Sequence, residues 1–195
     1  MPSDSFPLPH PRPHLYLRDP QAADAASIGA ALRDPRVAAH YGLVSDAGDA
    51  LGTGREQLEW MCELQASGRG WWQVIASADG QLLGAVGAYE RDDDGDSAEL
   101  GFWLRHDCWH QGLMQHALRL FVPLAFVRLR LHSLVAYVEP ANLASQRLLR
   151  ACGFHYEGLL RECTRRPSGY VSLQRFSLLR GEMAGACQSA SPICD

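Results

Sequence analysis

The sequence has no run of lysine and arginine residues and no long apolar stretch. Its 195 residues carry a net charge of −4, whereas a protein that binds nucleic acid through phosphates needs a concentrated basic surface. No window reaches the roughly 18 apolar residues of a membrane-spanning helix, and the first residues lack the basic and apolar regions of a secretion signal. We therefore expect a cytoplasmic protein that binds neither nucleic acid nor membranes.

Paired cysteines and glycine-rich phosphate loops are also missing. The six cysteines occur singly, without a Cys-x-x-Cys spacing, which is typical of reduced thiols rather than of disulfide frameworks or zinc sites. Neither Gly-x-x-x-x-Gly-Lys-Ser/Thr nor Gly-x-Gly-x-x-Gly occurs, which argues against the common nucleotide-binding loops. The aspartate-rich loop at residues 91–96 lacks the glutamate that closes a calcium loop, so we expect no metal.

The apolar content is sufficient for one compact domain. Hydrophobic residues make up 47% of the chain, which allows a sizeable core at this length. Residues 1–13 contain five prolines, and residues 183–195 are mostly small. We expect both ends to be flexible tails around a single domain at residues 14–182.

Hydrophobic periodicity and turn signals predict the element order β-α-α-β-β-β-α-β-α-β-β. This order predicts an α/β fold, in which helices pack on a mixed sheet. Thr53 is expected to cap the second helix, Asp79-Gly80 favours a tight hairpin, and Pro123 is expected to kink the long helix. The strands are expected at residues 14–18, 71–77, 82–89, 97–104, 132–138, 154–163 and 170–179, and the main helices at residues 22–32, 53–67, 111–128 and 142–150.

The segment Trp109-His110-Gln111-Gly112-Leu113-Met114 lies where a strand pattern stops and a helix pattern begins. The first N–H groups of a helix have no partner within it and lie at the positive end of its dipole, so backbone alone can hold a phosphate there. Gly112 lets the backbone approach such an anion closely. The pattern is common, but it makes the junction a candidate phosphate site.

Three other motifs keep a fixed order with this junction: Ala98-Glu99-Leu100-Gly101-Phe102-Trp103-Leu104 before it, and Asn142-x-x-Ser145 and Ala151-Cys152-Gly153-Phe154 after it. Together the four resemble the GNAT superfamily of acyl-CoA-dependent N-acyltransferases, and most closely its RimJ/RimL type. The resemblance implies a central, mostly antiparallel twisted sheet flanked by helices. The strands at residues 97–104 and 132–138 would run parallel and splay apart, and acetyl-CoA would lie in the opening.

The resemblance also implies where the cofactor is held. The pyrophosphate is expected on the backbone of residues 110–115, the pantetheine along the strand edge, and the cofactor arm against an asparagine. His110 is a departure, because relatives often carry glycine there. The expected cofactor-binding residues are Phe102, Leu104, His110, Gln111, Gly112, Leu113, Met114, Gln115, Asn142 and Ser145.

Two catalytic residues follow from the same likeness. Glu99 would accept the proton that an amine must lose before it attacks the thioester; the alternative is a strand glutamate paired with an arginine. Ser145 would donate a proton or a hydrogen bond to the CoA thiolate, although a serine in a first helical turn can simply contact backbone. Trp72, Trp103 and Tyr137 are the candidate acceptor-binding residues, although such aromatics usually lie in the core.

The sequence thus predicts metal-free transfer of an acetyl group from acetyl-CoA to a primary amine, either a protein N-terminus or a small molecule. The negative net charge favours a cationic acceptor. Two alternatives stay open. One is a relative that transfers another acyl group such as succinyl, and the other is a non-catalytic CoA-binding or interaction protein. The identity of the amine is open, and so is the assembly, for which a homodimer is one option.

Overall fold

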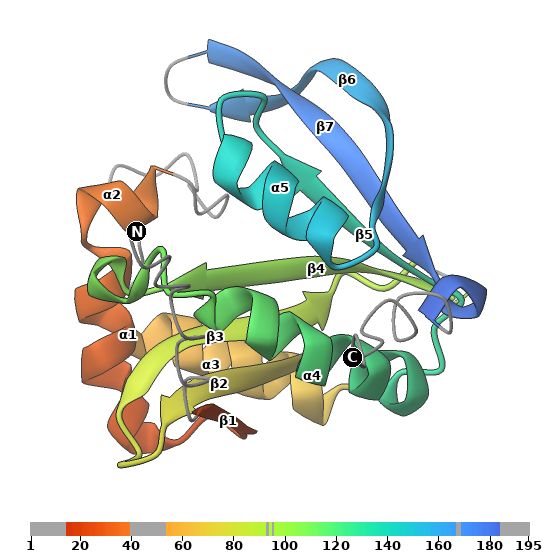
Figure 1. Cartoon of the computed structure of the whole chain (residues 1–195). Helices are drawn as coiled ribbons and strands as arrows, with labels where there is room; N and C mark the ends of the chain where they lie inside the picture. The colour runs from red at the N-terminus through yellow and green to blue at the C-terminus, as the bar shows by residue number, and fades with distance from the viewer. Residues whose placement is uncertain (1–14, 40–53, 93, 95, 167–168, 184–195) are drawn as a thin grey trace, which may run out of the picture.

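Seven strands form one sheet in the order β1-β2-β3-β4-β5-β7-β6 in the computed structural model, which describes residues 15–39, 54–92, 94, 96–166 and 169–183 (Figure 1). All neighbouring strands are antiparallel except β4 and β5, which run parallel. This arrangement confirms the predicted mixed α/β fold. The strands are β1 (Leu15–Arg18), β2 (Trp71–Ser77), β3 (Leu82–Tyr89), β4 (Ser97–Leu104), β5 (Ser133–Val138), β6 (His155–Arg166) and β7 (Gly169–Leu179).

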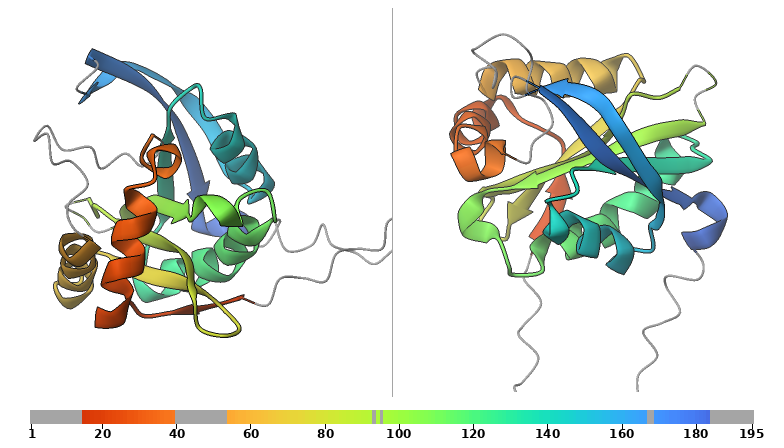
Figure 2. Two further views of the ribbon diagram at one scale, coloured as in Figure 1. Left: turned by 90° about the vertical axis from the view of Figure 1, so that its left-hand side faces the viewer. Right: turned by 90° about the horizontal axis from the view of Figure 1, so that it is seen from above.

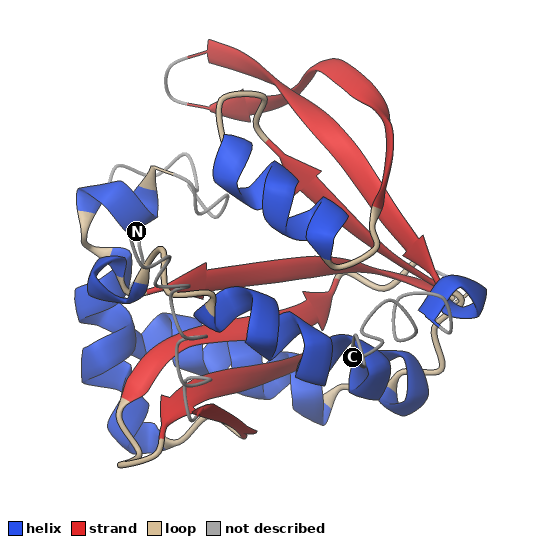
Figure 3. Ribbon diagram, viewed as in Figure 1, coloured by secondary structure: helices blue, strands red, loops and turns tan. Residues whose placement is uncertain are grey.

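Helices cover both faces of this sheet (Figures 2 and 3). The helices α4 and α5 lie on one face, and α1 and α3 lie on the other, so that the buried apolar side chains fall into two clusters. Amphipathic elements bury their apolar sides in this layered way. The helices are α1 (Ala25–Leu32), α2 (Pro35–Ala38), α3 (Gly54–Ala66), α4 (Leu113–Arg128) and α5 (Leu143–Ala151), with short 3-10 turns at Ala22–Asp24, His106–Cys108 and Arg180–Glu182.

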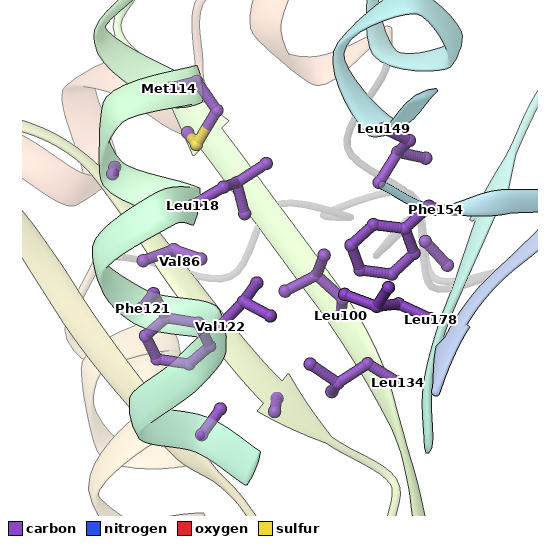
Figure 4. Close-up of a cluster of buried hydrophobic side chains, with 14 of the residues drawn as sticks. Val86, Leu100, Met114, Leu118, Phe121, Val122, Leu134, Leu149, Phe154 and Leu178 are labelled. Carbon is purple, nitrogen blue, oxygen red and sulfur yellow. The ribbon is translucent and has the colours of Figure 1, made fainter. Parts of the chain in front are cut away.

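The larger cluster lies between α4 and the sheet (Figure 4). It combines Leu118 and Phe121 of α4 with Leu100 of β4, Leu134 of β5 and Leu149 of α5. Strands on both sides of the β4–β5 pair therefore contribute to one core, so that β1 to β4 form one half of the sheet and β5 to β7 the other. Burial of this apolar surface holds the halves together even where main-chain pairing between them ends.

Main-chain pairing between β4 and β5 is short. It covers three residue pairs, from Ser97–Ser133 to Glu99–Val135. Beyond Glu99, β4 stays paired with β3 and β5 stays paired with β7 to the ends of the strands. The two parallel strands therefore separate from Glu99 onwards, as the resemblance implied.

Several boundaries differ from the prediction. The helix α4 begins at Leu113 rather than at residue 111, because Gly112 before it has a left-handed φ of 72°. The helix continues through Pro123 to Arg128, so the proline does not end it. The last hairpin is longer than expected, since β6 runs to Arg166. The predicted tail at residues 1–13, the start of the first strand at residue 14, the Thr53 cap and nearly all of residues 183–195 lie outside the described residues.

Trp72 of β2 lies against one glycine on each of the next two strands of the sheet. It is paired with Gly87 of β3, which is in turn paired with Gly101 of β4. A Cβ atom at Gly87 would lie 2.1 Å from Cδ2 of the Trp72 ring, which is 1% exposed. Close approach of the indole, rather than an unusual φ, therefore requires glycine here.

We expect Gly87→Ala to lower the free energy of unfolding by about 2 kcal/mol or more, because the added methyl group overlaps the buried Trp72 ring and forces it or the backbone to shift. Urea unfolding followed by circular dichroism measures the change. Gly181→Ala is the matched control, since a Cβ at Gly181 meets nothing within 4 Å. A small and equal change in both variants would contradict the predicted overlap.

Candidate active site

Two cavities meet where β4 and β5 separate. The first, which we call the hairpin cavity, has a volume of about 440 Å³ and is lined by β4, β5 and the β6–β7 hairpin. The second, the helix cavity, has a volume of about 480 Å³ and is lined by the end of β4, the start of α4 and α5. Phe102, Asn142 and Ser145 line both cavities. These three residues therefore mark the junction between them.

The helix cavity contains the N-terminus of α4. The first bond within the helix runs from the His116 N–H to the Gly112 carbonyl, so the N–H groups of the residues before His116 have no partner inside the helix. The first turn carries no acidic residue. Among the described residues that line this cavity there is an arginine, Arg147, but no aspartate or glutamate. The cavity is thus suited to an anion.

All six predicted junction residues, from His110 to Gln115, line the helix cavity together with Phe102 and Leu104. His110 has a φ of 60°, so it adopts the left-handed conformation that glycine takes without strain. Its side chain is exposed and borders the cavity. His110 therefore has a backbone conformation that glycine would also adopt.

Glu99 lies in the hairpin cavity, at the last residue of β4 that is paired with β5. The hydroxyl of Tyr89, its partner across β3 and β4, donates a hydrogen bond to Glu99 Oε1 at 2.7 Å. Burial raises the pKa of Glu99 to about 7; the Tyr89 hydrogen bond opposes this rise, and the negative charge of Glu90 adds to it. A carboxyl group with this pKa exchanges protons near neutral pH.

The arginine-paired alternative does not describe Glu99. None of the ion pairs within the described part of the chain involves it. Other acidic groups share its cavity, because Glu90 and Glu139 also line it. Arg166 supplies a positive charge there, with its Nη2 atom 3.9 Å from Glu139 Oε1. The hairpin cavity is therefore predominantly negative, in contrast to the helix cavity.

Asn142 and Ser145 form the start of α5. The side-chain Oδ1 of Asn142 accepts a hydrogen bond from the Ser145 N–H at 3.0 Å and caps the helix. One polar atom of Asn142 is therefore already used, which leaves its amide nitrogen for other contacts. The Ser145 hydroxyl has no hydrogen bond to any described residue, so the alternative that it contacts backbone is not seen.

The predicted acceptor-binding aromatics are not all in one place. Trp72 and Tyr137 line the hairpin cavity with Glu99, Trp72 from a buried position and Tyr137 from a more open one. Trp103 lines the helix cavity instead and is 4% exposed. Sequence reasoning did not single out Tyr89, although it lies in direct contact with Glu99.

Within the described residues, no group of three or more histidine, cysteine, aspartate or glutamate side chains is placed to hold a metal ion. The aspartate-rich loop is described only in part, because residues 93 and 95 fall outside the described ranges. Among the helices described, none has the length and apolar character needed to cross a membrane.

Comparison with known proteins agrees with this geometry. The sequence model of the acetyltransferase (GNAT) domain family matches residues 14–155. The chain is 28% identical over 174 residues to the uncharacterized N-acetyltransferase p20 of Bacillus licheniformis, covering 88% of this chain and 96% of that protein. It is also 28% identical over 149 residues to the uncharacterized N-acetyltransferase YoaA of Bacillus subtilis, covering 76% of this chain and 83% of that protein.

Among solved structures, the chain resembles the spermidine N-acetyltransferase from Vibrio cholerae in complex with CoA and spermine. The TM-score is 0.74 with 20% sequence identity, over 88% of this chain and 98% of that one. At this identity the likeness concerns the fold.

Proposed function

Because the chain belongs to the GNAT acetyltransferase family, we propose that it transfers the acetyl group of acetyl-CoA to a primary amine by direct attack, with Glu99 as the general base. The observation that carries this proposal is the meeting of two cavities of opposite character. One offers helix N–H groups and Arg147 to an anion, and the other offers a carboxyl group to an amine. The RimJ/RimL type is part of the proposal.

The helix cavity fits the donor. The free N–H groups at the start of α4 suit the pyrophosphate, and the edge of β4 that β5 leaves beyond Glu99 can pair with the extended pantetheine as an added strand would. Phe102 and Leu104 lie on that edge. Bound there, acetyl-CoA supplies an activated thioester carbonyl.

The junction supports the proton transfers. A primary amine is mostly protonated at neutral pH, and the ionised Glu99 accepts that proton, so that the amine lone pair becomes available for attack. Ser145, whose hydroxyl lies at the junction, donates a hydrogen bond to the departing CoA sulfur. Because a thiolate leaves readily, the contribution of Ser145 is smaller than that of Glu99.

The acceptor is a cationic amine. The carboxylates of Glu90, Glu99 and Glu139 attract positive charge into the hairpin cavity, and a volume of about 440 Å³ accommodates a small molecule or the first residues of a peptide. The Vibrio cholerae structure named above contains spermine. Polyamines and peptide N-termini are therefore the two acceptor classes to compare.

Acetyl-CoA is expected to raise the melting temperature by about 5 °C or more at saturating concentration, because a ligand that binds only the folded state stabilises it by mass action. Differential scanning fluorimetry measures the shift. S-acetylpantetheine, which lacks the pyrophosphate and the phosphorylated adenosine attached to it, should shift the melting temperature much less. No shift at millimolar acetyl-CoA would contradict the donor assignment.

Release of free CoA in the presence of an acceptor panel identifies the substrate. The panel contains polyamines and short peptides with free N-termini, each assayed with acetyl-CoA and with succinyl-CoA. We expect turnover with acetyl-CoA and a cationic amine. Turnover with succinyl-CoA alone would favour another acyl donor, and tight acetyl-CoA binding without any turnover would favour a non-catalytic protein.

A further inference from the structure

Tyr89 is placed by the register of the sheet to serve Glu99. The two residues face each other at the end of the β3–β4 pairing, and the Tyr89 hydroxyl lies 2.7 Å from Glu99 Oε1. Within the described residues, no other side chain donates a hydrogen bond to Glu99. One carboxylate oxygen is therefore held by the protein, while Oε2 is not.

The tyrosine ring is itself fixed on three sides. It stacks on Trp72 with ring centroids 5.7 Å apart and an angle of 23°, and it meets the edge of Trp60 at 5.4 Å and 70°. Gly101 lies under it on β4, where a Cβ atom would come within 2.7 Å of Tyr89 Cε1. Packing on these sides restricts the rotamers of Tyr89 and so fixes the position of its hydroxyl before any substrate binds.

We propose that Tyr89 is the positioning residue for the general base, an inference that rests on the proposed function. Its hydroxyl holds Oε1 of Glu99 and so turns Oε2 toward the amine proton in the hairpin cavity. The same hydrogen bond favours the ionised carboxylate, which is the form that accepts a proton. Tyr89 itself lines the hairpin cavity, and in this role it acts through Glu99.

Other charged and titratable groups face the same cavity. Glu90 follows β3 directly and raises the pKa of Glu99 through its charge. The negative charge of Glu139, which follows β5, is offset by the positive charge of Arg166 on β6. The other ionisable side chains that line the cavity are Tyr137 of β5 and Cys163 of β6. The burial that raises the pKa of Glu99 is thus opposed mainly by the hydrogen bond from Tyr89.

Tyr89→Phe tests the proposal, because it keeps the ring stacking and removes the hydroxyl. The full chain is assayed by CoA release with acetyl-CoA and one fixed acceptor amine, and kcat/KM is followed against pH. The acid limb should move upward by about one pH unit, because a hydrogen bond to a charged group is worth roughly that much in pKa. Activity below the limb should fall about tenfold, with a much smaller loss above it. Tyr170→Phe, at an exposed position outside both cavities, should leave the profile unchanged.

A limb that stays in place while kcat/KM falls equally at all pH values would overturn the proposal, because it would show a structural role alone. Gly101→Ala provides a second variant if Tyr89→Phe folds poorly. Its Cβ displaces the tyrosine ring, and it should move the limb in the same direction. Glu99→Gln separates a failure of the proposed base, Glu99, from a failure of the proposed role of Tyr89. A limb that persists in that variant contradicts Glu99 as the base, whereas loss of the limb in Glu99→Gln together with an unmoved limb in Tyr89→Phe contradicts only the role of Tyr89.

Discussion

Glutamine in place of Glu99 is expected to lower kcat/KM for acetyl transfer by about a hundredfold or more, the usual contribution of a positioned general base. The carboxylate is the active form and its pKa is about 7, so wild-type activity should rise as the pH increases through 7. The variant lacks this rise. The difference between the two proteins should therefore be largest above pH 7 and shrink below it, where the wild-type carboxyl is protonated.

The same substitution should leave the Kd for acetyl-CoA nearly unchanged, because Glu99 lines the hairpin cavity and not the helix cavity. It should not weaken the fold. The folded pKa lies above the ordinary value of 4.5, so the stability linked to the protonated carboxyl is fully present below about pH 4.5 and is lost as the pH rises through 7. Glutamine cannot ionise, and at pH 8 the variant should be at least as stable as the wild type.

Glu99→Asp, which keeps a carboxylate one methylene shorter, should recover part of the lost activity. Titration calorimetry with acetyl-CoA and thermal melts complete the comparison. Parallel losses of turnover, CoA affinity and stability in Glu99→Gln would instead indicate a structural residue.

Replacing Gly112 with valine is expected to raise the Kd for CoA about tenfold or more. The glycine has a φ of 72°, a conformation that costs a β-branched residue roughly 1 to 3 kcal/mol. A Cβ there meets nothing within 4 Å, so the effect comes from the backbone rather than from a clash inside the protein. Either the N–H groups at the start of α4 turn away from the anion, or the added side chain occupies the place of the phosphate. Isothermal titration calorimetry with CoA measures the loss.

Gly68 offers a matched control for this substitution. It has a φ of 70°, also with nothing within 4 Å of a Cβ, but it follows α3 and lines neither cavity. Gly68→Val should therefore carry a similar cost in the free energy of unfolding without any change in CoA affinity. Equal Kd values for the two variants would contradict phosphate binding by the α4 backbone.

Local sequence signals were sufficient for the order of the strands and the longer helices and for the junction before α4, but they missed the short helix α2 at Pro35–Ala38. The parallel pairing of β4 and β5 came from the ordered motifs, because periodicity describes single strands and not their neighbours. The separation of Trp103 from Glu99 could have been found from the sequence. Both lie on β4, and four residues of extended chain span about 13 Å, which is enough to place them in different cavities.

The environment of Glu99 could not be derived in this way. Its pKa depends on burial in the hairpin cavity and on Tyr89, and the contact with Tyr89 depends on the register between β3 and β4. The pair formed by Glu139 and Arg166 joins the end of β5 to the end of β6. Such contacts arise from tertiary packing, which local sequence patterns do not predict.

The β6–β7 hairpin faces only one of the two cavities. Its residues Leu160, Cys163, Thr164, Arg166 and Leu173 line the hairpin cavity, and none of the described hairpin residues lines the helix cavity. Under the proposed function, mutations in the hairpin would therefore alter the choice of amine without changing the residues that face the donor. Protein engineering could therefore change the proposed acceptor site through the hairpin alone and leave the helix cavity as it is.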